Sequence, residues 1–82
     1  MYVEQLPPHD ERAEESVLGS LLIEGDAILR IATILKPDDF YRERNRWCYE
    51  ACLSLWDSNE AINPVTVGHR LAVTDRLEDV GG

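Results

Sequence analysis

The stretch that decides the fold is the run RERNRWCYEACLSLWDSN over residues 42–59. It contains no proline or glycine, and its apolar residues recur at helical rather than strand spacing. One apolar stripe follows the spacing i, i+3, i+4, i+7 and consists of Cys48, Ala51, Cys52 and Leu55. A second stripe lies about a quarter-turn around the helix axis from the first and consists of Tyr49, Leu53 and Trp56. The run therefore predicts a central helix that is packed on two sides.

Upstream of this run, the sequence predicts two helices. Asp10 is a candidate N-cap for the first, and Gly19 inside that helix predicts another backbone packed closely against it. Gly25 and Asp26 interrupt this helix, and Asp26 is a candidate cap for the second. The inward positions predicted for the second helix are Ile28, Ile31, Ala32 and Leu35.

Two proline positions mark the remaining boundaries. Residues 37–39 can form a single further turn that sets Phe40 and Tyr41 as a plug before the central helix. Downstream, Asn63 followed by Pro64 is an N-cap with proline at the first helical position. No region has a convincing strand pattern. The prediction is an all-α fold, a small orthogonal bundle of about four main helices plus short turns.

The chain length of 82 residues allows one small domain. Pro7 and Pro8 keep residues 1–9 extended as an N-terminal arm, so the predicted helical domain covers residues 10–82. No apolar run approaches the ~20 residues of a membrane span. Glu4 lies near the start, and no basic segment leads into an apolar one, so no secretory signal is predicted. These features predict a cytoplasmic location without membrane contact.

The net charge of −8, from 16 acidic and 8 basic residues, argues against direct binding of DNA or RNA. The local exception is a cluster of three arginines, Arg42, Arg44 and Arg46. One interpretation pairs them with Asp38 and Asp39 just upstream. The other makes them a basic patch that faces a protein partner. Both interpretations remain open at the level of the sequence.

The second stripe of the central helix also has two interpretations. The helix from Pro64 to Val73, together with Leu77, can fold back over it and bury it. Alternatively the stripe stays partly open and contacts a partner, a role that suits tyrosine and tryptophan. The candidate protein-contact residues are therefore Tyr49, Leu53, Trp56, Arg42, Arg44 and Arg46. By contrast, the first stripe should be buried against the first two helices, through Cys48, Cys52 and Leu55.

No catalytic residue, cofactor-binding residue or metal ligand can be assigned. No glycine is followed by Lys-Ser or Lys-Thr, so a phosphate-binding loop is missing. Cys48 and Cys52, at i and i+4, are poorly placed for a disulfide, and neither His9 nor His69 completes a zinc pattern with them. His69 is expected on a helix exterior. The chain itself is therefore not expected to be an enzyme.

Several segments, in order and at similar intervals, resemble the N-terminal domain of the DnaB-type replicative DNA helicases of bacteria and phages. They are Leu-Pro-Pro at 6–8, AEESVLGSLL at 13–22, LKPDDFY at 35–41, Glu-Ala at 50–51, PVTV at 64–67 and VGG at 80–82. The chain departs from this family where Cys48 and Cys52 replace larger aliphatic residues. It also departs where His9 and Asp10 replace a more usual Gln-Asn type pair.

This resemblance implies a non-catalytic assembly module. The family forms ring-shaped hexamers that unwind the replication fork with ATP, and ATP and Mg²⁺ are implied only for a C-terminal motor domain that this chain lacks. The N-terminal domain forms a collar of paired subunits and takes part in contacts with primase and helicase loaders. The chain resembles the head of that domain without the helical hairpin that follows. The alternative is a stand-alone helical adaptor, such as the helicase-contacting domain of a primase, but a Leu-Pro-Pro segment at the very start of a chain favours the helicase.

Overall fold

The computed structural model describes residues 10–74, and within them it contains helices and no strand. The elements in chain order are α1 (Glu11–Ile23), the 3-10 helix η1 (Gly25–Ala27), α2 (Ile28–Ile31), the 3-10 helix η2 (Pro37–Asp39), α3 (Glu43–Asp57) and α4 (Pro64–Val73). The all-α prediction is confirmed. The predicted arm at 1–9 lies outside the described residues.

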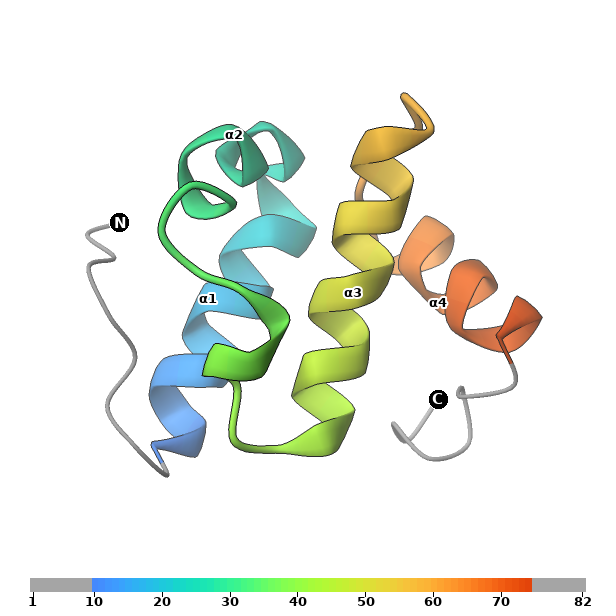
Figure 1. Cartoon of the computed structure of the whole chain (residues 1–82). Coiled ribbons are helices and arrows are strands. Elements are labelled where there is room, and N and C mark those ends of the chain that lie inside the picture. The colour runs from blue at the N-terminus through green and yellow to red at the C-terminus, as the bar shows by residue number, and fades with distance from the viewer. Residues whose placement is uncertain (1–9, 75–82) are drawn as a thin grey trace.

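Helix α3 lies between α1 and α4, and it contacts α1, α2, η2 and α4 (Figure 1). Helices α1 and α3 lie side by side with their N-termini at the same end of the bundle, because α2 and η2 carry the chain back between them. The buried residues of α3 include Cys52 and Leu55 from the first stripe. The prediction of a central helix is therefore confirmed.

Two of the three predicted caps are present. The Asp10 carboxylate accepts a hydrogen bond from the Ala13 amide at 3.0 Å and caps α1. The Asn63 side chain accepts from the amides of Val65 and Thr66 and caps α4. The predicted cap at Asp26 is wrong, because Asp26 lies inside η1 and no side chain caps the start of η1 or α2.

Helix α2 is shorter than predicted. It spans four residues and ends at Ile31. Of the predicted inward positions, Ile28, Ile31 and Leu35 are buried, whereas Ala32 is exposed. The single turn at η2 is confirmed, but only half of the predicted plug is present. Phe40 is fully buried, whereas Tyr41 is 60% exposed.

The close backbone approach lies at Gly25 rather than at the predicted Gly19. Among residues 10–74, a side chain added at Gly19 would meet no atom within 4 Å, so this part of the chain does not supply the predicted close backbone. A Cβ added at Gly25 would lie 2.9 Å from the carbonyl oxygen of Ile62. The missing side chain therefore lets the turn after α1 pack directly against the α3–α4 loop.

Tyr49 and Cys52 are the buried ionisable residues of α3. The Tyr49 hydroxyl donates a hydrogen bond to the carbonyl of Leu35 at 2.7 Å, and its ring lies 4.9 Å from that of Phe40 between centroids. Burial raises the pKa of Tyr49 from its ordinary 10.0 to about 12. Burial also raises the pKa of the Cys52 thiol from 9.0 to about 12. Both side chains are therefore neutral in the folded domain at neutral pH.

These two raised pKa values predict that alkali destabilises the domain. Each group loses its proton more readily in the unfolded chain, so the unfolded state binds fewer protons above about pH 9. The stability that they contribute is complete below pH 9 and is lost as the pH rises toward 12. Urea unfolding at successive pH values measures this, and the slope should be smaller for Tyr49→Phe. A free energy of unfolding that stays constant between about pH 9 and 11 would contradict the assignment.

Candidate protein-contact site

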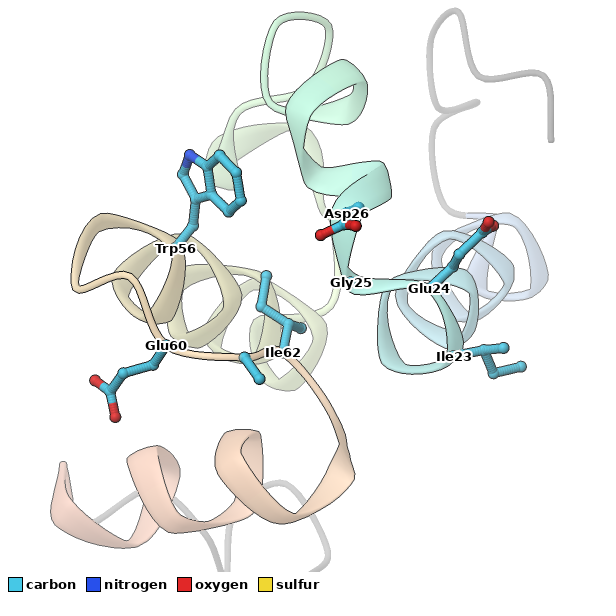
Figure 2. Close-up of a pocket in the computed structure, with 8 residues that line it drawn as sticks. Ile23, Glu24, Gly25, Asp26, Trp56, Glu60 and Ile62 are labelled. Atoms are coloured by element: carbon cyan, nitrogen blue, oxygen red, sulfur yellow. The ribbon is translucent and has the colours of Figure 1, made fainter.

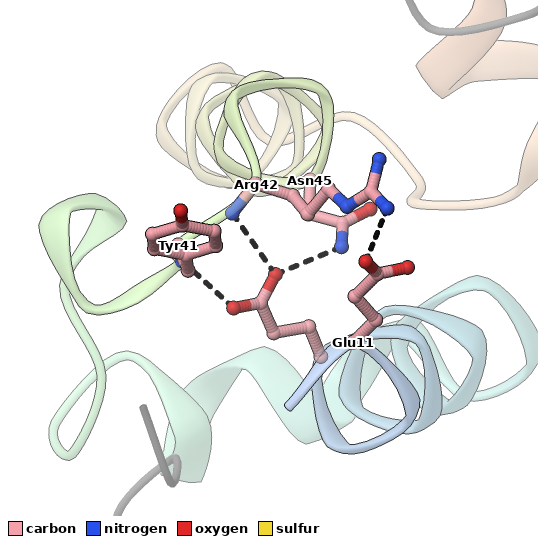
Figure 3. A network of polar contacts seen from close by, with 5 residues as sticks. Glu11, Tyr41, Arg42 and Asn45 are labelled. Carbon is pink, nitrogen blue, oxygen red and sulfur yellow. Dashed lines mark hydrogen bonds and ion pairs between the residues drawn. The ribbon is translucent and has the colours of Figure 1, made fainter. Parts of the chain in front are cut away.

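The three arginines at the start of α3 have different environments. Arg42 forms an ion pair with Glu11 of α1, and this pairing raises the pKa of its guanidinium (Figure 3). Arg46 donates a hydrogen bond to the carbonyl of Phe40 at 3.3 Å. Arg44 is exposed. Two of the three predicted contact residues are therefore engaged within the domain, which leaves Arg44 as the more accessible one.

The predicted pairing of these arginines with the aspartates of η2 is wrong. Within residues 10–74, neither Asp38 nor Asp39 forms an ion pair with them. Instead, the Asp39 carboxylate accepts a hydrogen bond from the Lys36 amide at 2.7 Å. This short-range bond closes the single turn of η2, so the Asp39 carboxylate binds within its own turn and not to an arginine of α3.

The central polar contact at this end of the bundle is made by Glu14 of α1, which is 1% exposed. Its carboxylate accepts hydrogen bonds from the Tyr41 amide at 2.7 Å, the Arg42 amide at 3.3 Å and the Asn45 side-chain amide at 2.9 Å (Figure 3). The N-terminal end of a helix carries partial positive charge, which favours a carboxylate there. Glu14 therefore joins α1 to the two residues that lead into α3 and to Asn45 in the first turn of α3.

The role of Glu14 is not assigned by the sequence analysis, although the sequence contains a signal for it. Glu14, Val17, Leu18 and Leu21 are the buried residues of α1, and they follow the spacing i, i+3, i+4, i+7. A carboxylate in phase with an apolar stripe faces the interior and loses its hydration. It therefore needs hydrogen-bond donors from the protein to compensate for that loss. That phase marks Glu14 as an internal residue.

The second stripe of α3 divides into a buried and an exposed part. Tyr49 is fully buried against Leu35 and Phe40, Leu53 is half-buried, and Trp56 is 38% exposed. Of these three predicted contact residues, Trp56 is therefore the one that presents most surface to a partner.

Helix α4 does not cover this stripe. It faces the side of α3 that carries Ala51 and Ser54, and Arg70 of α4 donates a hydrogen bond to the Ser54 hydroxyl at 2.7 Å. That side lies across the helix from Trp56, given the rotation of about 100° per residue. The interpretation that α4 buries the second stripe is therefore wrong, and Leu77 lies outside the described residues.

Trp56 lines a hollow of about 330 Å³ at the C-terminal ends of α1 and α3. In Figure 2, Trp56 on α3 and Asp26 on η1 lie on opposite sides of this hollow, with Ile62 between them. Ile23, the last residue of α1, is 89% exposed and points outward at the rim. The hollow combines an apolar surface with three acidic residues, Glu24, Asp26 and Glu60. In Figure 2 the carboxylate of Asp26 faces the side of the hollow that holds Trp56, whereas those of Glu24 and Glu60 point outward.

The two cysteines are both free, but only one has the predicted burial. Cys52 is buried, whereas Cys48 is half-buried. Burial raises the pKa of the Cys48 thiol, and the positive charge of Arg44 partly opposes that shift.

Within residues 10–74, no three residues of the types His, Cys, Asp and Glu are grouped so that they could hold a metal ion. In the same range, no helix is long and apolar enough to cross a membrane.

The fold and the site define a small helical domain. At one end, the buried carboxylate of Glu14 joins α1 to the start of α3, and at the other end Trp56 and Ile23 are exposed. Residues 6–82 match the model of the DnaB-like helicase N terminal domain. The chain belongs to that family, whose matched domain is the N-terminal, non-motor part of a replicative helicase.

Curated relatives agree with this family. The chain is 43% identical over 79 residues to the replicative DNA helicase DnaC of Bacillus subtilis. The aligned region covers 96% of this chain and 17% of that protein. It is 35% identical over 82 residues to the replicative DNA helicase DnaB of Geobacillus stearothermophilus, covering 100% of this chain and 18% of the relative. The chain thus spans about a fifth of the length of these relatives.

A solved structure has the same fold. The crystal structure of the N-terminal domain of DnaB helicase from Mycobacterium tuberculosis superposes with a TM-score of 0.88 at 40% identity. The match covers 94% of this chain and 55% of that one.

Proposed function

We propose that this chain is a non-catalytic assembly and protein-interaction module of a replicative hexameric DNA helicase. In this role it supports ring formation with other copies of the domain and contacts primase or a helicase loader in the cytoplasm during DNA replication. The observation that carries the proposal is the exposed, Trp56-lined hollow on a domain whose family is that of a helicase N-terminal domain. Unwinding and ATP hydrolysis are assigned to other parts of the longer protein.

A stand-alone adaptor, such as the helicase-contacting domain of a primase, is the alternative function. The curated relatives favour the helicase, because the two described above are replicative helicases that match over nearly the whole of this chain. A gene that continues downstream into a phosphate-binding loop would decide for the helicase.

The chain is expected to hydrolyse no ATP and to bind no single-stranded DNA at moderate salt. A net charge of −8 repels a polyanion, and two of the three clustered arginines are held by Glu11 and by the Phe40 carbonyl. Fluorescence anisotropy with a labelled oligonucleotide measures binding, and phosphate release measures hydrolysis. Micromolar binding that weakens steeply with salt would contradict the proposal, and loss of that binding in Arg44→Ala would locate its cause.

A further inference from the structure

The end of the bundle that holds the Trp56 hollow carries more negative charge than folding favours. The C-terminal ends of α1 and α3 lie at this end, and aligned peptide dipoles give each of them partial negative charge (Figure 1). Basic residues normally offset that charge, yet neither helix has one in its last turn. Instead, three acidic residues lie around the hollow there.

The charge at this hollow is only partly neutralised within the domain. Arg70 forms an ion pair with Glu60. Within residues 10–74, Glu24 and Asp26 have no ion-pair partner, and both are exposed. Glu24 follows the last residue of α1, where an unpaired acid lowers the stability of the folded domain, so folding alone does not explain it. Asp26 lies in the first turn of η1, where an acid is favoured, but its charge still faces the hollow without an ion-pair partner among the described residues.

The floor of the hollow is held by backbone packing. The absence of a side chain at Gly25 places the turn after α1 against Ile62, which is itself buried. Because two segments far apart in sequence are locked together here, the hollow is shaped before any partner binds. Above this floor, the indole of Trp56 offers an apolar face, and Ile23 extends the apolar surface at the rim.

We propose that this hollow docks a positively charged amphipathic segment of another protein. An apolar side chain of that segment seats between Trp56 and Ile62, and a lysine or arginine side chain reaches the carboxylate of Asp26, which faces the hollow. A second copy of this chain is a poorer occupant, because each copy carries a net charge of −8. The proposal rests on the proposed function and names the chemistry of the partner.

The direct probe is a synthetic amphipathic helical peptide of leucine and lysine, compared with a peptide in which glutamate replaces every lysine. The whole chain, labelled with ¹⁵N, is titrated with each peptide and observed by two-dimensional NMR. The leucine–lysine peptide is expected to shift the indole N–H of Trp56 and the amides of Gly25 and Asp26. The leucine–glutamate peptide is expected to leave these signals in place.

Matched surface variants separate docking from general attraction between opposite charges. Ile23→Ser and Asp26→Lys are expected to weaken binding of the leucine–lysine peptide by about tenfold or more. Val73→Ser removes another exposed apolar side chain, this one from α4, and Glu43→Lys reverses an exposed charge at the other end of α3. Both controls should bind within about twofold of the unchanged chain. Because Ile23 and Asp26 are exposed, their variants are expected to keep the thermal midpoint of the unchanged chain.

Three results would overturn the proposal. One is that Glu43→Lys weakens peptide binding as much as Asp26→Lys does. Another is equal binding of the leucine–glutamate peptide. The third is self-association of the unchanged chain, seen by sedimentation and lost in Ile23→Ser, which would assign the hollow to a second copy. None of these results bears on the DNA-binding test above, so the docking proposal and the proposed function can fail separately.

Discussion

Replacing Glu14 by alanine is expected to unfold most of the domain at 25 °C. The change removes the acceptor of one buried hydrogen bond, from the Asn45 side chain, and of two partly buried ones, from the Tyr41 and Arg42 amides. Each unsatisfied buried donor costs about 1–3 kcal/mol, and a core of this size rarely supplies more than ~3–5 kcal/mol. The variant also removes the group that holds α1 to the start of α3, so both helices lose support together.

Urea denaturation followed by circular dichroism measures this loss. Glu15→Ala is the matched control, because Glu15 is the next residue of the same helix and is exposed. It should lie within about 0.5 kcal/mol of the unchanged chain. Glu14→Gln, which keeps one acceptor oxygen, should fall between the two. A Glu14→Ala variant as stable as Glu15→Ala would show that the buried carboxylate does not join the helices.

The second large effect is expected for Cys52→Asp. Cys52 is 1% exposed within the apolar core, so the new carboxylate must either lose its hydration or take up a proton. An unpaired buried charge costs several kcal/mol, which is comparable to the total stability expected of this domain. The variant should therefore be unfolded at neutral pH.

Cys48→Asp provides a graded comparison for this prediction. Cys48 lies one helical turn before Cys52 on α3 but is half-buried, so a carboxylate there can reach water. Its thermal midpoint should fall clearly less than that of Cys52→Asp. If both variants kept the midpoint of the unchanged chain, the first stripe would face solvent and the rotation of α3 about its axis would have to be reassigned.

Features set by neighbouring residues could be predicted from the sequence. The caps at Asp10 and Asn63 depend on amides only two or three residues away. The burial of Cys52 and Leu55 follows from a stripe at one helical period. Such signals need no knowledge of which helix packs against which, and they were sufficient to predict the all-α class.

Features set by tertiary packing could not be predicted in the same way. The Glu14 carboxylate finds partners 27 to 31 residues further along the chain. Helix α4 packs on the Ser54 side of α3, and the loop that leads into α4 packs against Gly25. That contact depends on two backbone segments meeting. The exposure of Trp56 follows from this choice of side, so the candidate site emerged only from the arrangement of the helices.

We assign the polar groups around Arg42–Arg46 at the start of α3 to internal packing, and the hollow beside Trp56 near the end of α3 to contact with another protein. One NMR titration of the ¹⁵N-labelled chain tests both assignments, first with a single-stranded oligonucleotide and then with the leucine–lysine peptide. The oligonucleotide should move no signal, and the peptide should move those of Gly25, Asp26 and Trp56. Shifts of the amides of residues 42–46 with the oligonucleotide, and none at the hollow with the peptide, would contradict the account.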